Sequence, residues 1–411
     1  MRLRAAGMDD VVVLEAGDGV GGRVRTDVVD GFLLDRGFQI FLTSYPEVAA
    51  TLDYDALELK PFYAGAKVWW NGGFHQVADP FRHPIDGVLS LANPIGTVLD
   101  KILVGIFRFR ATLGSLDALY TRPEVTIAQR LEREGFSSVM ADRFFRPFLG
   151  GIFFDRALGT SSRHFEFVMR MLATGANCLP AKGIGAVVDQ MAARLPGSCV
   201  HLSTRVAVVE GQREGACASV TTADGETVTA RKGVIVASDG PEAQRLLGDA
   251  LAKAGASKPQ PGVGTSCLYF SAASPPPSTL PMLYLNGEDG GIVNNCCFPS
   301  TIAPSYAPPG ATLVSVSTIG TCDGMDETAL EAAAKAQLGR WFGEGYVASW
   351  RLLRVYRIAF AQPNQAPPTD FTRPVSLGSG LYVCGDHRDS ATLDGAFVSG
   401  RRAADALLGK A

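Results

Sequence analysis

The 411-residue sequence predicts an α/β protein, on three observations. Two short apolar runs, Val11–Leu14 near the N-terminus and Leu381–Cys384 near the C-terminus, have the composition of parallel strands buried on both faces. Each run leads into an acidic residue among glycines, Glu15 in the first case and Asp386 in the second. The long segment between them mixes helical and strand patterns. We therefore expect the two ends of the chain to contribute parallel strands and to converge on one ligand.

The first of these units has the second half of a dinucleotide-binding motif without its first half. Met1–Gly7 has the pattern of the end of a helix, with Gly7 as its C-terminal stop. Glu15 ends the following strand, where such sites bind the ribose hydroxyls of adenosine. A strand, a glycine turn and a helix normally come first. The sequence thus predicts a discontinuous Rossmann-like domain whose first strand is missing, and we expect a truncated N-terminus.

Gly17–Gly22 formally matches a phosphate-binding loop, but the residues after it do not begin a helix. A helix N-terminus is what holds a pyrophosphate. Here the next residues lack a 3.6-residue period, and Asp30-Gly31 between apolar runs predicts a hairpin. Gly21, Gly22 and Arg23 are therefore interpreted as a loop that follows the second strand of the motif.

The middle of the chain opens with a predicted hairpin over 66–77 that turns at Asn71-Gly72. Residues 80–175 are predicted to be mostly helical. Thr126 begins a capping box in this region. Pro147 and Gly150-Gly151 are expected to end one of its helices.

Pro94–Leu113 is apolar but carries charges such as Asp100 and Lys101, so it is too short and too charged to span a bilayer. We expect a buried or lid helix here. Peripheral membrane contact through 94–113 is the alternative.

Helical and strand patterns then alternate. A clean apolar row predicts a helix over Gly185–Leu195. The region 200–238 is β-rich, with a hairpin at Asp224-Gly225 and a buried strand over Gly233–Ala237.

The C-terminal unit consists of the strand Leu381–Cys384, the turn Gly385-Asp386 and a helix opened by Gly395-Ala396. Gly385 would let the backbone approach a ligand, and Asp386 can accept hydrogen bonds from ribityl hydroxyls. The helix N-terminus would face the electron-rich edge of a flavin. Together with the N-terminal unit, this predicts a flavin site formed by the two ends of one chain.

Composition excludes several other classes. A net charge of −3 and a pI near 6.0 give no footprint for nucleic acid. The eight cysteines show no CxxC spacing and the five histidines are scattered, which predicts no metal site and favours a reducing compartment, cytoplasm or plastid. Localisation is otherwise undetermined, and so is the oligomeric state.

Several motifs in this order resemble the FAD-dependent amine oxidase, phytoene desaturase and protoporphyrinogen oxidase superfamily. They are Glu15 with Gly21-Gly22-Arg23, Asp35-Arg-Gly37, Pro180–Gly185, Arg205-Val206 with Asp224-Gly225, Ala361-Gln-Pro363, and Leu381–Arg402.

The resemblance implies an FAD-binding domain from 1–60, 176–240 and 356–411, with an inserted α+β substrate domain from 61–175 and 241–355. It also implies roles for single residues. Glu15 would hold the adenosine ribose and Val206 would meet the adenine through its backbone. The pyrophosphate, isoalloxazine and ribityl regions would be lined by Gly21, Gly22, Arg23, Gly37, Gln39, Gly385, Asp386, Gly395 and Ala396.

The sequence departs from amine oxidases at two positions. The strand over Gly264–Phe270 has no lysine, and Thr392 stands where many amine oxidases have an aromatic residue. Both departures favour the desaturase-like branch, in which the flavin takes a hydride from a small apolar substrate, isoprenoid or tetrapyrrole-like. The alternatives are a redox-neutral carotenoid-type isomerase and a flavin-deficient remnant that acts as a binding protein. No catalytic residue is singled out.

Overall fold

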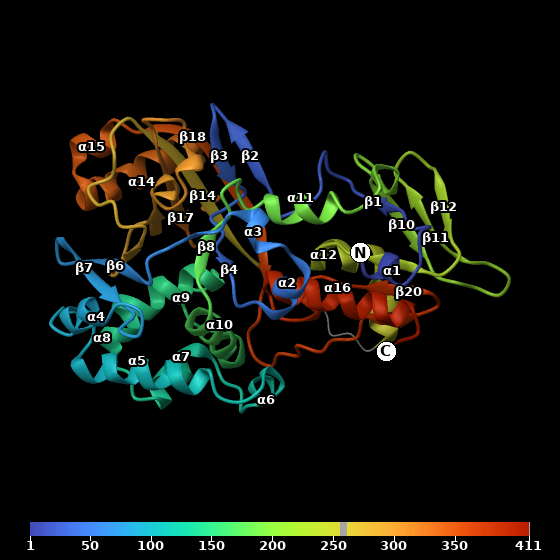
Figure 1. Cartoon of the computed structure of the whole chain (residues 1–411), viewed down its shortest axis with the longest axis horizontal. Coiled ribbons are helices and arrows are strands. Elements are labelled where there is room, and N and C mark those ends of the chain that lie inside the picture. The colour runs from blue at the N-terminus through green and yellow to red at the C-terminus, as the bar shows by residue number, and fades with distance from the viewer. Residues whose placement is uncertain (255–260, 411) are drawn as a thin grey trace.

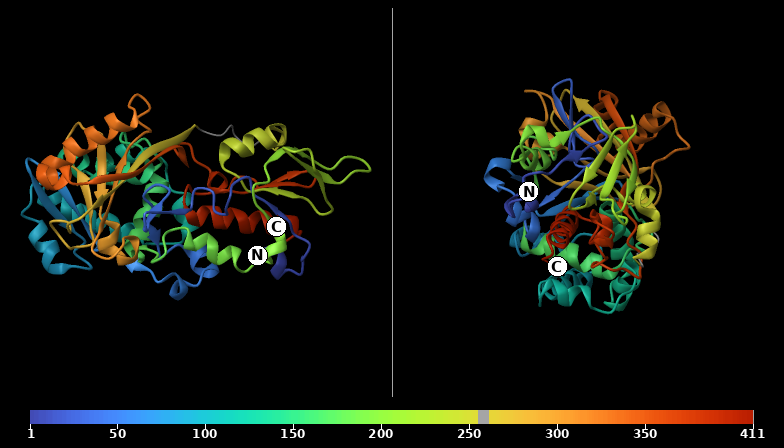
Figure 2. Two further views of the ribbon diagram at one scale, coloured as in Figure 1. Left: turned by 90° about the horizontal axis from the view of Figure 1, so that it is seen from above. Right: turned by 90° about the vertical axis from the view of Figure 1, so that its right-hand side faces the viewer.

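The computed structural model describes residues 1–254 and 261–410 and shows a mixed α/β protein (Figure 1). A large sheet and a group of helices lie at one end of the elongated molecule. Smaller sheets surround the C-terminal helix α16 (Leu393–Leu407) at the other end (Figures 1 and 2). The N- and C-termini lie near each other at this second end, as Figure 2 shows.

The large sheet has seven strands in the order β18-β14-β17-β16-β15-β6-β7, all antiparallel except the pair β15 and β6. One hydrophobic core forms where α14 (Glu327–Phe342) and α15 (Glu344–Ala348) pack on this sheet, around Trp341 and Trp350. The strands are β6 Gly65–Trp70, β7 Gly73–Ala78, β14 Gly262–Ala272, β15 Leu283–Asn286, β16 Val293–Cys297, β17 Thr312–Thr318 and β18 Arg351–Pro363.

The segment 80–175 is mostly helical, as predicted. Its helices share a core of aromatic and aliphatic side chains with the segment 41–57. The capping box is confirmed, because Thr126 Oγ1 accepts from the Gln129 backbone N–H at 3.2 Å. The helices are α4 Pro84–Ser90, α5 Val98–Ala111, α6 Leu116–Tyr120, α7 Ile127–Arg133, α8 Ser138–Met140, the π-helix η1 Ala141–Phe145, α9 Arg146–Phe153 and α10 Ser162–Thr174.

The prediction that Pro147 and Gly150-Gly151 end a helix is wrong, because α9 runs through all three residues. Pro147 directly follows the π-helix η1 within one continuous helical run over 138–153, and the wider π turn accommodates a residue that has no N–H to donate. Gly151 lies against the sheet, and a Cβ there would come within 2.8 Å of Asn294 Nδ2. These glycines therefore allow close packing instead of ending the helix.

The parallel pairing at the other end occurs in two separate sheets. β1 (Val13–Leu14) pairs in parallel with β9 (Val200–His201), and β13 (Val234–Val236) pairs in parallel with β20 (Leu381–Val383). The expected burial of the first strand on both faces is wrong, since Val12 is 48% and Val13 37% exposed. The reason is that β1 has only one neighbouring strand among the described residues.

The predicted hairpins are confirmed. β2 (Thr26–Val29) and β3 (Phe32–Asp35) turn at Asp30 and Gly31, which have φ of +51° and +81° as a type I′ turn requires. The turns at 71–72 and 224–225 likewise join antiparallel strands. The remaining named elements are α1 Arg2–Ala5, β4 Phe41–Leu42, α2 Pro46–Thr51, α3 Tyr54–Leu57, β5 Lys60–Pro61, β8 Asn177–Leu179, α11 Ala186–Ala192, η2 Gly197–Cys199, β10 Val206–Glu210, β11 Ala218–Thr222, β12 Thr227–Ala230, α12 Gly240–Lys253, α13 Pro299–Ile302, η3 Pro304–Tyr306, β19 Ser376–Gly378 and η4 Asp386–Arg388.

Over residues 1–254 and 261–410, no helix is long and apolar enough to cross a membrane. The same residues contain no cluster of histidine, cysteine and acidic side chains suited to a metal ion. All eight cysteines are free thiols.

Candidate cofactor and substrate site

The two ends of the chain meet at an ion pair between Arg23 and Asp386. The guanidinium donates to both carboxylate oxygens, at 2.8 and 2.9 Å, although the two residues are 363 positions apart. Arg23 also donates to the Ala361 carbonyl at 2.8 Å, and its own carbonyl accepts from Gln39 Nε2 at 2.8 Å. Burial lowers the pKa of Arg23, but the hydrogen bond and charge of Asp386 raise it further, so the guanidinium stays charged. Three predicted cofactor residues are thereby held together.

The glycine-rich loop before Arg23 folds around Arg25 and is followed by the β2–β3 hairpin, not by a helix. Arg25 pairs with Asp18 at 2.7 Å. Gly21 has φ of +109°, and a Cβ there would lie 2.5 Å from the Val24 carbonyl oxygen. Gly22, with φ of +55°, also adopts the left-handed region. The loop therefore requires glycine for its own backbone path, which agrees with its interpretation as a connecting loop.

Glu15 lies at the end of β1, beside the start of the β10–β12 meander. Its Oε1 accepts from the Gly17 N–H at 2.6 Å, and its carbonyl accepts from the Thr204 N–H at 2.8 Å. The latter contact brings Glu15 close to the backbone that enters β10 at Val206. The Val206 carbonyl accepts from Arg245 Nη2 at 2.9 Å. The structure thus brings Glu15 and Val206 into one neighbourhood, as the resemblance implies.

The C-terminal unit is fixed by short polar contacts. The Ser399 hydroxyl, on α16, accepts from the Gly385 N–H at 3.0 Å and donates to the Gly385 carbonyl at 2.8 Å. Thr392 caps α16 by accepting from the Gly395 N–H at 3.1 Å, so the helix begins two residues before the predicted Gly395-Ala396. A Cβ at Gly395 would lie only 2.0 Å from the Ser390 carbonyl oxygen, so this position requires glycine.

Buried polar atoms without a protein partner gather around the Gly385-Asp386 turn. Both ring nitrogens of His387 and the Nε and Nη1 of Arg388 are buried and make no hydrogen bond within the described residues. Burial lowers the pKa of His387 to about 4, and burial together with the charge of Arg373 lowers that of Arg388 to about 10. Unpaired buried donors are costly to leave unsatisfied. Such donors beside the turn fit a phosphate-bearing ligand such as FAD.

Asp35 ties the β2–β3 ribbon to two distant segments. Its Oδ1 accepts from the Thr26 hydroxyl at 2.6 Å and from the Ile184 N–H at 2.9 Å. Its Oδ2 accepts from the Tyr306 hydroxyl at 2.9 Å. Burial raises the pKa of Asp35 to about 6, against the lowering effect of these three hydrogen bonds. The sequence singled out the motif that begins with Asp35 but not its contact with Tyr306. Gly37, just beyond, has φ of +86° and packs on Ile358.

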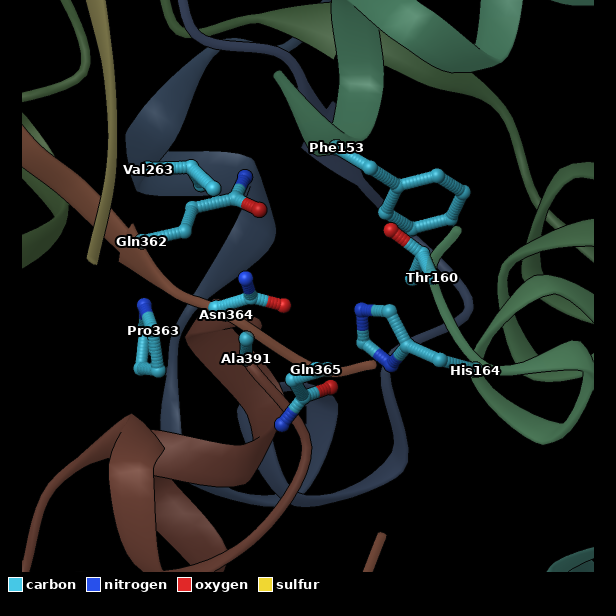
Figure 3. A pocket seen from close by; sticks show the side chains of 9 residues that line it. All are labelled: Phe153, Thr160, His164, Val263, Gln362, Pro363, Asn364, Gln365 and Ala391. Carbon is cyan, nitrogen blue, oxygen red and sulfur yellow. The ribbon is translucent and has the colours of Figure 1, made fainter. Parts of the chain in front are cut away.

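A small pocket lies where α9, α10, the end of β18 and the segment before α16 meet (Figure 3). Its volume of about 10 Å³ accommodates about one water molecule. Its lining contains no aspartate, glutamate, lysine or arginine. The lining residues come from both the helical layer and the C-terminal unit. The lining residues are Phe153, Thr160, His164, Val263, Gln362, Pro363, Asn364, Gln365 and Ala391.

Two lining side chains present unpartnered polar atoms. His164 is 1% exposed, lies against Phe153 with ring centroids 5.1 Å apart, and leaves its Nδ1 unbonded. Burial lowers the pKa of His164 to about 3, so the ring is neutral at physiological pH. Gln365 donates from Nε2 to the Asp389 carbonyl at 3.1 Å, which leaves its Oε1 without a partner. The pocket therefore offers neutral hydrogen-bonding groups in an apolar surrounding.

Sequence reasoning missed both His164 and Gln365. His164 stands in a helical stretch whose periodicity indicates core packing, and nothing local distinguishes it from a structural histidine. Gln365 lies two residues after Ala361-Gln-Pro363, so proximity to that motif was the only available signal. Ala391, adjacent to Thr392, was within the motif at the C-terminus but had no assigned role.

Comparison with known proteins identifies the family. The family model for flavin containing amine oxidoreductases matches residues 1–408. The chain belongs to the flavin-containing amine oxidoreductase family. It is accordingly an FAD-dependent oxidoreductase. No curated protein matches it.

Solved structures share the fold at low sequence identity. An oxidoreductase from Methanosarcina mazei has a TM-score of 0.75 at 16% identity, and the match covers 100% of this chain and 96% of the other. Putrescine oxidase bound to putrescine has a TM-score of 0.69 at 17% identity, covering 99% and 95%. Reduced UDP-galactopyranose mutase has a TM-score of 0.69 at 17% identity, covering 100% and 92%. These likenesses confirm the mixed α/β fold.

Proposed function

We propose that this flavoenzyme is desaturase-like and oxidises an apolar substrate, isoprenoid or tetrapyrrole-like, by hydride transfer to flavin N5. The supporting observation is the chemistry of the pocket, whose lining carries no acidic side chain, lysine or arginine. A buried site without a counter-charge disfavours a cationic amine, because an unpaired ion is expensive to desolvate. The adjoining strand β14 also contains no lysine.

Bound FAD supplies the hydride acceptor. The pocket accommodates about one water molecule, so its residues would contact only one end of the substrate. Phe153, Val263 and Pro363 give the pocket apolar walls. For a substrate that carries a terminal hydroxyl or carbonyl, His164 Nδ1 and Gln365 Oε1 offer hydrogen bonds to that group. Because the His164 ring is neutral, it orients this group without adding a charge beside the reacting carbon.

The cofactor would be held by the residues that the two ends contribute. We assign Glu15 and Val206 to the adenosine half, and Arg23 with Asp386 to the pyrophosphate and ribityl region. Their support is the Arg23–Asp386 pair and the proximity of Glu15 to the backbone entering β10. We correspondingly assign residues 1–60, 176–240 and 356–411 to an FAD-binding domain, and residues 61–175 and 241–355 to a substrate domain.

Anaerobic reduction of the FAD-loaded protein tests the substrate class. The probes are phytoene as an acyclic isoprenoid, a porphyrinogen, and putrescine as a cationic amine. Loss of the visible flavin absorbance with phytoene or the porphyrinogen, and not with putrescine, supports the proposal. Reduction by putrescine alone would overturn it. Conversion of a polyene isomer without net flavin reduction would also overturn it, in favour of an isomerase.

A further inference from the structure

One arginine at the end of η4 is buried and has no side-chain partner. Arg388 is 2% exposed, and its Nε and Nη1 make no hydrogen bond within the described residues. The ion pairs around this turn are made by Arg23 and Arg402 instead. A buried cation loses its hydration, and only a partner of opposite charge offsets that cost. The Arg388 guanidinium therefore requires a negative group that these residues do not supply.

A second arginine, Arg373, lies beside Arg388 and also has a free donor. Its Nη1 donates to the His387 carbonyl at 3.0 Å, which holds its guanidinium against η4. Its Nε is buried and unbonded within the part of the chain that the structure describes. Burial and the positive charge of Arg373 both lower the pKa of Arg388. Two like charges so close together repel, and a negative group that contacts both would remove the repulsion.

The surrounding charges leave this pair of arginines with an excess of positive charge. Arg402 of α16 donates to the carbonyls of Arg388 and Arg373, at 3.4 and 2.8 Å. Arg402 also pairs with Asp389 at 3.5 Å, so the charges of these two side chains offset each other. Asp370 is the other carboxylate whose charge reaches both arginines, and it is exposed to solvent. One exposed carboxylate thus opposes one buried and one half-buried guanidinium.

We propose that Arg388 and Arg373 form a binding site for a phosphate group. The free donors are Nε and Nη1 of Arg388 and Nε of Arg373. Guanidinium groups are well suited to phosphate oxygens, because they combine a permanent charge with several N–H donors in a fixed plane. A bound water molecule would satisfy these donors but would leave the positive charge without a counter-charge. A phosphate group satisfies the donors and offsets the charge.

Two sources of phosphate fit the position of this site, the diphosphate of FAD and free inorganic phosphate. Burial and the charges of Arg388 and Arg23 lower the pKa of His387, so this ring lies near both arginines. The phosphate site therefore adjoins the Arg23–Asp386 pair that we assign to the pyrophosphate and ribityl region. The FAD source rests on that proposed assignment, whereas the inorganic source does not.

Thermal unfolding of the flavin-free full chain with inorganic phosphate tests the site. Phosphate at about 10 mM is compared with a phosphate-free buffer of equal pH and equal ionic strength, adjusted with sodium chloride. We expect phosphate to raise the melting temperature of the wild type by at least about 2 °C, because a ligand of the folded chain stabilises it. Arg388→Met and Arg373→Met should each lose most of this rise. The matched control is Arg108→Met, which should keep it, because Arg108 already pairs with Asp79 at 3.2 Å.

The FAD-loaded protein distinguishes the two sources of phosphate. If the diphosphate of FAD occupies the site, the loaded protein no longer responds to inorganic phosphate. Arg388→Met then weakens FAD binding at least about tenfold and leaves the binding of riboflavin, which has no phosphate, unchanged. If the site takes a separate phosphate, the loaded and flavin-free proteins respond alike.

Two results would overturn the inference. One is a flavin-free wild type whose melting temperature phosphate does not raise. The other is a rise in Arg388→Met as large as in the wild type. Flavin binding measured on the same preparations shows whether the proposed cofactor site also fails, so the two failures are distinguishable.

Discussion

The buried His164 should make the protein sensitive to acid, and His164→Phe should remove part of that sensitivity. The pKa of His164 falls from 6.5 to about 3 on folding because the ring is buried without a partner. Between about pH 3 and pH 6.5, His164 therefore binds a proton in the unfolded chain but not in the folded chain. Stability attributable to His164 is complete above pH 6.5 and is lost as the pH falls toward 3.

The magnitude follows from the two pKa values. A pH of about 4.5 lies roughly two units below the unfolded-state pKa, so at this pH protonation of His164 in the unfolded chain lowers the unfolding free energy by about 3 kcal/mol. A phenylalanine does not titrate, and Phe153, Phe167 and Phe371 already surround this position with centroids 5.1, 6.4 and 6.1 Å away. The free-energy difference between about pH 7 and pH 4.5 should therefore be about 3 kcal/mol smaller in His164→Phe than in the wild type.

Urea unfolding followed by tryptophan fluorescence at both pH values measures this difference. Carboxyl groups such as Asp35 and Asp389 titrate in both proteins, so their contributions cancel. The exposed Val28 provides a non-titrating control, and Val28→Ser should keep the wild-type pH profile. Parallel pH profiles for wild type and His164→Phe would refute the conclusion that His164 is held neutral.

Three other substitutions have defined outcomes. Arg388→Met should raise the melting temperature of the FAD-free protein, since a buried guanidinium with unbonded Nε and Nη1 costs about 1–3 kcal/mol; a lower melting temperature would contradict this. Asp35→Asn should gain stability relative to the wild type as the pH rises from about 4 to 6, because burial raises the pKa of Asp35 to about 6 and its own contribution to stability falls over this range; a constant difference between the two proteins in thermal melts would count against it. A double-mutant cycle with Arg23→Met and Asp386→Asn should give a coupling of about 1–2 kcal/mol, reduced because the Arg23 side chain is 35% exposed; zero coupling in urea unfolding would show that the pair does not join the two ends.

Local chemistry explains which elements the sequence predicted well. The hairpins at 30–31 and 71–72 follow from dipeptides that favour positive φ, and the Thr126 cap follows from a side chain three residues before Gln129. Cofactor motifs near the two ends could be matched to a family, and the Arg23–Asp386 contact shows that these ends meet. In each case the signal lies within a few residues or in a motif of fixed order.

Features that depend on distant packing could not be predicted. Gly150 and Gly151 have the pattern of a helix stop, and only the approach of Asn294 shows why α9 continues through them. Tyr306 reaches Asp35 across 271 positions. His164 becomes a pocket residue because β18 ends beside α10, which no helical period reveals. The exposure of Val12 and Val13 depends on which strands pair with β1, and composition does not determine that.

The most direct test of the account is an FAD titration of the purified full chain. Absorbance and flavin fluorescence report binding, with Asp386→Asn and Gly395→Val as variants at the C-terminal unit and Val28→Ser as the surface control. The account predicts saturable binding of one FAD per chain, at least about tenfold weaker in both site variants and unchanged in the control. A folded protein that binds no FAD, or that binds it equally well in all variants, would contradict the central claim that the two ends form the cofactor site.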